Sequence, residues 1–143
     1  MIILGADHAG LELKETLKQY LVEKNEDVLD IGANTLDAND NFSTFVKLMA
    51  DAFYKNENAK IIAVCGSGVG MNIGLNKNKN IFCCLGHTFE EVSKAREHNN
   101  INALALGGRT TSVKDAKQMV DAFLTTTHLG GKYTKRMEDI DLK

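Results

Sequence analysis

The sequence contains no proline and no tryptophan, and only three of its 143 residues are cysteines. An odd number of cysteines at irregular spacing argues against a disulfide framework, so Cys65, Cys83 and Cys84 are expected to be free thiols. Free thiols are typical of a reducing compartment, and we therefore expect a cytoplasmic protein. The lack of proline carries no functional conclusion.

Long apolar runs and an excess of one charge are missing as well. No apolar run reaches the roughly 20 residues of a membrane-spanning helix, and the N-terminal segment lacks the basic stretch of a signal peptide. The formal net charge of -2 at pH 7 provides no basic field for nucleic acid or anionic lipid. With 43% hydrophobic and 25% charged residues, the chain is expected to form a single domain over residues 1–143.

Short apolar runs alternate with amphipathic patterns along the chain. The apolar runs predict the strands Met1–Ala6, Val28–Ile31, Ile61–Cys65, Ile81–Leu85 and Ala103–Leu106. Patterns of helical spacing predict the helices Leu11–Glu23, Phe42–Tyr54, Met71–Asn76, Thr88–Glu97 and Val113–Leu124, and a helical tail from about residue 130 that contains Lys132–Leu142. This alternation predicts an α/β fold, a doubly wound sheet of five parallel strands with helices on both faces.

The loop after the third strand is the most informative segment, because ligands of such sheets bind outside the carboxyl ends of the strands. Residues 65–70 read Cys-Gly-Ser-Gly-Val-Gly. Alternate glycines let the backbone turn tightly and aim several N–H groups at one point beside a helix N-terminus, which favours an anion there. The same field favours the thiolate of Cys65. The alternative is a structural turn with a buried cysteine.

Two common glycine motifs do not match this loop. Its spacing is GxGxG rather than the GxGxxG of dinucleotide sites, and no GK[ST] of a triphosphate loop follows. His, Cys, Asp and Glu do not stand at the short spacings of zinc or two-metal sites. We therefore expect neither a cofactor nor a metal ion.

Polar residues follow other strands of the predicted sheet at the same edge. Asp7 and His8 come directly after the first strand, where they either act on a ligand or cap the first turn. Arg109 follows the fifth strand, and Lys132 and Arg136 lie in the tail. Cations in these places suit a phosphate ester, and the alternative is ordinary surface charge.

His98 stands at the other end of its predicted helix, before the fifth strand. That end faces the wrong edge of the sheet for a site built from one chain. Taken alone, His98 is typical of a helix C-terminus. A functional role would require a neighbouring subunit to deliver it.

Five motifs stand in order along the chain: GADHAG, CGSGVGMNIGLNK, AREHNN, LALGGR and GGKYTKRMEDI. Together they resemble the type B ribose-5-phosphate isomerase family, which also includes galactose-6-phosphate isomerase subunits. The resemblance implies a Rossmann-like sheet and interconversion of ribose 5-phosphate and ribulose 5-phosphate, a step of the pentose phosphate pathway, without cofactor. It also implies a homodimer or a dimer of dimers with sites shared across the interface, which would explain the position of His98.

The resemblance assigns roles to individual residues. Cys65 resembles the base that takes the C2 proton, and Ser67 stands where relatives more often carry a proton-shuttling threonine. Asp7 and His98 match residues that open the sugar ring, and Asn99 matches one that bonds the enediolate region. The backbone of Gly66, Gly68, Val69 and Gly70 would bind the enediolate, and the phosphate would contact His8, Arg109, Lys132 and Arg136.

Three departures from the family pattern bear on specificity. Asn41-Phe42-Ser43 replaces an Asp-Tyr-Pro of many relatives and removes a phenol that would contact the sugar. Lys132-Tyr133 replaces an Arg-His pair and removes one bidentate fork from the phosphate clamp. Met71 stands where some relatives carry a glutamate base, so Cys65 is the only candidate base.

Two alternatives to a ribose-5-phosphate isomerase stay open. The same motifs would suit an isomerase of a six-carbon sugar phosphate, such as galactose 6-phosphate or allose 6-phosphate. A sugar-phosphate-binding protein without catalysis is the other alternative, and the joint presence of Cys65, Asp7 and His98 speaks against it.

Overall fold

Five parallel strands form one sheet in the computed structural model, which describes residues 1–140. The strands are β1 (Ile2–Ala6), β2 (Val28–Gly32), β3 (Lys60–Cys65), β4 (Cys83–Leu85) and β5 (Ala103–Gly107), in the spatial order β2-β1-β3-β5-β4. The helices are a 3-10 turn η1 (His8–Gly10), α1 (Leu11–Glu23), α2 (Phe42–Lys55), α3 (Val69–Asn76), α4 (Phe89–Asn99), α5 (Val113–Thr125) and α6 (Lys132–Ile140). The predicted α/β fold class is confirmed.

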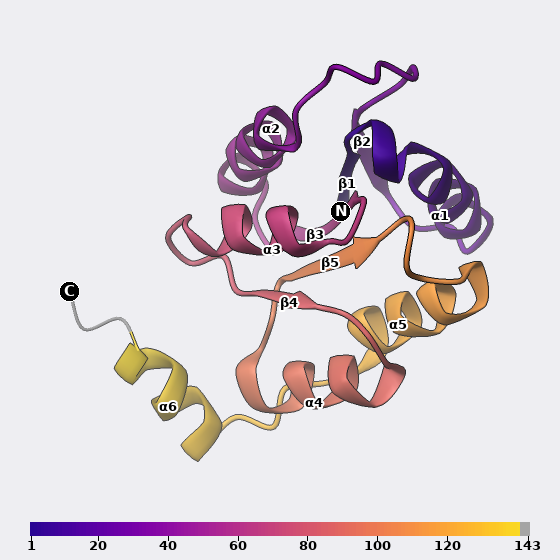
Figure 1. Cartoon of the computed structure of the whole chain (residues 1–143). Coiled ribbons are helices and arrows are strands. Elements are labelled where there is room, and N and C mark those ends of the chain that lie inside the picture. Colours follow the sequence, from indigo (N-terminus) through magenta and orange to yellow (C-terminus); the bar gives the residue numbers. More distant parts are fainter. Residues whose placement is uncertain (141–143) are drawn as a thin grey trace.

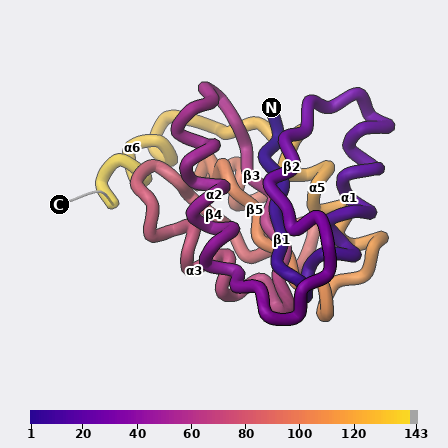
Figure 2. The backbone as a smooth tube through the Cα atoms, turned by 90° about the horizontal axis from the view of Figure 1, so that it is seen from above, coloured from indigo at the N-terminus to yellow at the C-terminus, as the bar shows by residue number. Residues whose placement is uncertain are grey.

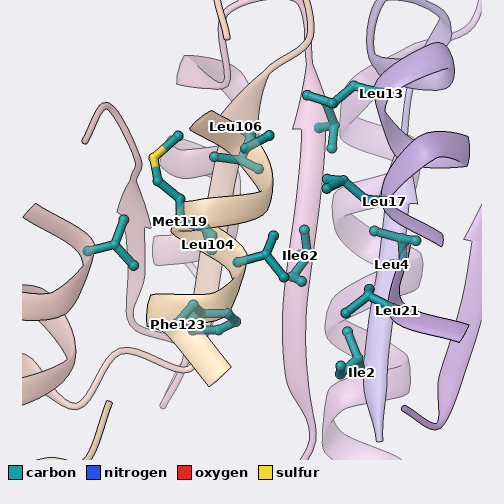
Figure 3. Close-up of a cluster of buried hydrophobic side chains, with 14 of the residues drawn as sticks. Ile2, Leu4, Leu13, Leu17, Leu21, Ile62, Leu104, Leu106, Met119 and Phe123 are labelled. Atoms are coloured by element: carbon teal, nitrogen blue, oxygen red, sulfur yellow. The ribbon is translucent and has the colours of Figure 1, made fainter. Parts of the chain in front are cut away.

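Helices cover both faces of the sheet, α2 and α3 on one face and α1, α4 and α5 on the other (Figure 1). The period of two along a strand divides its side chains between two cores. In β1, Leu4 joins the core under α1 and α5, whereas Ile3 joins the core under α2. Figure 3 shows the first core, in which Leu17 of α1 and Phe123 of α5 face the strands and are fully buried. Each such side chain contributes about 2 kcal/mol by its burial.

The fourth strand departs from the prediction at its start. β4 begins at Cys83 rather than Ile81, because Ile81 closes a turn with its N–H on the carbonyl of Asn78. The apolar run of this strand would suit a buried position, but Cys83 and Cys84 are both only half-buried, because β4 is an edge strand. Asn76 of α3 covers this edge, donating to the carbonyl oxygen of Cys83 at 2.9 Å and accepting from its N–H at 2.8 Å.

A buried ion pair fixes the chain after β2. Lys14 of α1 is fully buried and donates to both carboxylate oxygens of Asp30, at 2.8 and 3.0 Å, and to the carbonyl of Ala33. Ala33 in turn donates to the carbonyl of Ala6 at the end of β1. Burial alone would raise the pKa of Asp30, but hydrogen bonds from Lys14 and Lys18 outweigh it and lower that pKa. The loop that leaves β2 is thus anchored beside the end of β1.

The C-terminal helix α6 projects from the body of the molecule (Figures 1 and 2). Its described residues include none that is buried. His128 connects it to α4, with Nδ1 2.8 Å from the carbonyl of Glu97 and Nε2 3.0 Å from the hydroxyl of Thr134. The predicted helix is present from Lys132 to Ile140, and its predicted end at Leu142 lies outside the described residues. No helix within residues 1–140 is long and apolar enough to span a membrane.

Candidate active site

The loops that follow β3 and β5 are joined by backbone hydrogen bonds. The N–H of Gly108 donates to the carbonyl of Cys65 at 2.7 Å, and that of Arg109 donates to the carbonyl of Gly66 at 3.0 Å. The N–H of Asp7, which follows β1, donates to a backbone carbonyl of β3, so the loop after β1 is joined to the other side of β3. The carboxyl ends of three neighbouring strands therefore present their loops as one surface, as a parallel sheet favours.

Cys65 ends β3 with only 5% of its surface exposed, and the glycine loop turns directly above it into α3. Gly68 adopts φ 81°, a left-handed conformation that a side chain would oppose, and caps α3. The hydroxyl of Ser67 accepts from the N–H of Val69 at 3.3 Å. The first amides of a helix lack intrahelical acceptors, so this turn can bind an anion next to the thiol.

Asp7 is 7% exposed at the end of β1. Its Oδ1 accepts from the N–H groups of Ala9 and Gly10, at 3.0 and 3.2 Å, and so caps η1. Within residues 1–140, its second oxygen has no hydrogen-bond donor. Asp7 therefore caps the first turn, and one oxygen is left for a ligand.

His8 and Arg109 line one groove beside this edge. The Nδ1 of His8 lies 2.7 Å from Oδ1 of Asp40, a residue of the loop between β2 and α2. The guanidinium of Arg109 lies above the glycine loop, since a Cβ placed on Gly66 would sit 3.4 Å from its Nη1. An imidazole and a guanidinium thus flank the start of the anion-binding turn, an arrangement that suits a phosphate.

Ligand spacing along the chain predicted no metal cluster, yet the fold brings Asp7, His8 and Asp40 within 4.8 Å of one another. One side-chain atom of each residue in this trio is already used in a hydrogen bond. Oδ1 of Asp7 caps η1, and Nδ1 of His8 bonds to Asp40. The trio therefore has an explanation in hydrogen bonding.

The other predicted residues gather around α6. The ring of His98 stacks on that of Tyr133, with centroids 4.5 Å apart and planes 11° from parallel. Lys132 and Arg136 both lie over the Tyr133 ring, at 5.3 and 5.4 Å from its centre. Asn99 contacts the sulfur of Met137 in α6, at 3.4 Å. The tyrosine that departs from the family pattern thus holds the histidine and the two cations together.

The predicted residues therefore form two groups. We call Asp7, His8, Cys65–Gly70 and Arg109 the loop group, and His98, Asn99, Lys132 and Arg136 the tail group. The loop group lies at the carboxyl ends of the strands, and the tail group lies at the far end of α4. Figure 1 shows α6 on the side where β5 begins, away from its arrowhead. One chain does not bring the two groups together.

Two residues of this region were not singled out as site residues by sequence reasoning. Asp40 lies 32 positions from His8 and is one of several polar residues in its loop. Tyr133 was noted only because it replaces a histidine of the family pattern. Neither contact follows a local spacing rule, so only the resemblance could have directed attention to them.

Comparison with known proteins places the chain among sugar-phosphate isomerases. A sequence model described as ribose/galactose isomerase matches residues 2–140. The probable ribose-5-phosphate isomerase B of Mycoplasma genitalium is 35% identical over 140 residues, which cover 97% of this chain and 92% of that protein. The ribose-5-phosphate isomerase B of Mycobacterium tuberculosis (strain H37Rv) is 35% identical over 139 residues, with 97% and 86% covered.

Comparison with solved structures agrees with the sequence comparison. The crystal structure of the M. genitalium enzyme with bound ribulose 5-phosphate has a TM-score of 0.93 at 35% identity, covering 97% of this chain and 92% of that one. The enzyme from Thermotoga maritima also gives a TM-score of 0.93 at 35% identity, with 98% and 96% covered.

Proposed function

Because the chain belongs to the ribose/galactose isomerase family and is an isomerase, we propose that it interconverts ribose 5-phosphate and ribulose 5-phosphate. The bound ribulose 5-phosphate of the M. genitalium relative supports this substrate. The observation that carries the proposal is the joining of the Cys65 and Arg109 loops. A thiol, an anion-binding turn and a cation then stand at one edge, and aldose–ketose isomerisation needs a base, an oxyanion hole and a phosphate clamp.

Opening of the sugar ring comes first. Asp7 and His98 are the proposed pair, one to take the proton of the O1 hydroxyl and the other to protonate the ring oxygen. The free oxygen of Asp7 supports its part. General acid–base assistance of this kind is worth about 10²–10⁴ in rate.

Proton transfer between C2 and C1 follows, with Cys65 as the base. The thiolate takes the proton of C2, the electrons of that bond form the C1–C2 double bond, and O1 becomes an oxyanion. Amides of Gly66–Gly70 bind this enediolate together with Asn99, at roughly 3 kcal/mol per well-placed donor. Return of the proton to C1, while Ser67 passes the O2 proton to O1, completes the ketose.

The phosphate is held at the far end of the substrate. His8 and Arg109 supply contacts from the loop group, and Lys132 and Arg136 supply them from the tail group. Hydrogen bonds to a charged phosphate are worth about 1.5–3 kcal/mol each. Binding this remote group orients the reacting carbons above Cys65.

The separation of the two groups supports a homodimer or a dimer of dimers. We propose that the tail group of one subunit completes the loop group of its partner. The projecting α6, which is unburied within its own chain, supports this arrangement. We place the reaction in the cytoplasm, where three free thiols would stay reduced.

An assay of the pure protein with ribose 5-phosphate, galactose 6-phosphate and allose 6-phosphate tests the proposal. We expect kcat/KM to be highest for ribose 5-phosphate. Preference for a six-carbon substrate would change the assigned substrate but leave the proposed aldose–ketose isomerisation in place. Turnover of none of the three would refute the proposal.

A further inference from the structure

Asp40 makes two contacts with His8, and both use the same carboxylate oxygen. The backbone N–H of His8 donates to Oδ1 of Asp40 at 2.9 Å, and the ring Nδ1 lies 2.7 Å from that oxygen. The second distance is that of a charge-assisted hydrogen bond. The carboxylate accepts, so the ring proton resides on Nδ1.

The surroundings of Asp40 show that this carboxylate serves His8. Its side chain is 13% exposed, and its second oxygen is buried without a hydrogen-bond partner within residues 1–140. In that part of the chain, every donor to the carboxylate comes from His8. Burying a carboxylate with one unsatisfied oxygen costs free energy, so we expect its contact with His8 to serve a function.

We propose that Asp40 is a positioning residue for phosphate binding, which it performs by fixing the ring of His8. With Nδ1 bonded to Asp40, Nε2 is the nitrogen left for a ligand in the groove that His8 shares with Arg109. When Nε2–H donates to a phosphate oxygen, the carboxylate compensates the positive charge of the imidazolium. The proposal rests on the role of His8 in the proposed function.

Hydrogen bonds at both ends hold the loop that carries Asp40 in place. The loop that carries Asp40 leaves β2 at the Lys14–Asp30 pair, and Ala33 is bonded to the end of β1. At its other end, the side chain of Asn41 caps α2 through the N–H of Ser43. Both ends of the loop are therefore fixed, and Asp40 reaches His8 from a supported segment.

Histidine ¹⁵N NMR on the full-length chain tests the hydrogen bond directly, with the His8 signal assigned by its absence in His8→Gln. Neutral His8 is expected to carry its proton on Nδ1 in the parent protein. In Asp40→Ala it should revert mainly to the Nε2–H form that free histidine prefers. An Nδ1–H form that persists in Asp40→Ala would overturn the proposal.

Inorganic phosphate is the second probe, because its binding needs no turnover. Asp40→Ala should weaken phosphate binding by about 10- to 100-fold, the range of one charge-assisted hydrogen bond. Asp40→Asn keeps the acceptor and loses the charge, so it should give a smaller loss and serves if the alanine variant does not fold. Asp37→Asn, in the same loop, should bind as the parent does. An unchanged Kd in both Asp40 variants sinks the proposal, whether or not the chain isomerises ribose 5-phosphate.

Steady-state kinetics separate positioning from simple support of the fold. Asp40→Ala should raise KM for ribose 5-phosphate by the same factor and leave kcat within about threefold. In a His8→Ala background, the added Asp40→Ala should raise KM no further, because Asp40 acts through the ring. A second, equal rise in the double variant would show that Asp40 acts without His8.

Discussion

The ring of Phe42 lies directly against Gly70. A Cβ placed on Gly70 would sit 2.9 Å from Cε2 and Cζ of that ring. Phe42 opens α2 and Gly70 belongs to the first turn of α3, so this contact joins the second crossover of the fold to the anion-binding loop. Phe42 is 37% exposed beside the site.

Phe42→Tyr should lower KM for ribose 5-phosphate by about 2- to 10-fold, the worth of one neutral hydrogen bond. The new hydroxyl extends from Cζ, which lies next to the first turn of α3. Phe89→Tyr, at an exposed ring in α4, is the matched control. If Phe42→Tyr and its control give the same KM, the phenol that many relatives carry is not a substrate contact here.

Cys65→Ala should lower kcat by about 10²–10⁴, the usual worth of a positioned base. No carboxylate stands in the loop to replace it, because Met71 fills the next candidate position. Circular dichroism and an unchanged affinity for phosphate would show that the fold and the clamp survive. A kcat within a few-fold of the parent would mean that Cys65 is not the base.

Alkylation by iodoacetamide should inactivate the protein through Cys65, and bound ribose 5-phosphate should protect it. Cys83 and Cys84 are more exposed than Cys65 but should react slowly. Burial raises the pKa of both thiols, so little thiolate is present at neutral pH. Mass spectrometry of the labelled peptides gives the order of reaction, and faster labelling of Cys84 would contradict this reading.

Mixed dimers test the shared site. A chain with Cys65→Ala and a chain with His98→Ala should regain activity when refolded together, because each hybrid dimer has one site free of substitutions. Random pairing gives about a quarter of the parent activity. The control mixes His98→Ala with Arg136→Ala, which damages the tail group in both chains and should restore nothing. Recovery in neither mixture, with hybrids verified by mass, would place each site within one chain.

Chelators should leave activity unchanged. The only acid–histidine trio that the described residues bring together, Asp7 with His8 and Asp40, is engaged in hydrogen bonds. Activity after dialysis against EDTA should equal that before it. Loss that magnesium or zinc reverses would assign a metal to this trio.

Acid should weaken the fold through Asp30. Its pKa is lowered in the folded state, so an unfolded chain binds a proton there that the folded chain does not. The stabilisation is fully present above the ordinary aspartate value of about 4 and is lost as the pH falls through the lower folded value. Asp30→Asn should cost about 2 kcal/mol at pH 7, since it leaves the buried ammonium of Lys14 with only the half-exposed Glu15, 2.9 Å away, as a carboxylate partner.

Urea unfolding at pH 7 and at pH 3 measures this effect. The gap in unfolding free energy between the parent and Asp30→Asn should narrow in acid. Asp51→Asn, on the exposed side of α2, should keep a constant gap. A gap that widens in acid would reverse the assigned sign.

The pattern of apolar residues along the chain was sufficient to predict the central strands of the sheet. β1, β3 and β5 are buried on both faces and read as continuous apolar runs, and their predicted bounds hold to within a residue. β4 was predicted two residues too long, because Ile81 closes a turn with Asn78 and the N–H of Phe82 bonds to the side chain of Asn102 instead of continuing the strand. Hydrophobicity does not distinguish a strand from a buried turn of the same composition.

Residues at strand ends could be predicted because topology alone brings them together. Asp7, Cys65 and Arg109 follow neighbouring strands, so parallel order places them at one edge. The His8–Asp40 bond and the His98–Tyr133 stack depend on the path of a loop and on the direction of α6. Neither path has a periodic signal in the sequence, and these contacts required the folded chain.

Asn76 has a consequence for how copies of this chain meet. An open sheet edge invites a strand from another molecule, which is a common start of aggregation. Here the outward N–H and carbonyl of Cys83 are already saturated by one side chain. An incoming strand would have to displace Asn76 before pairing with β4. At this position of β4, one side chain thus protects the edge against uncontrolled sheet extension.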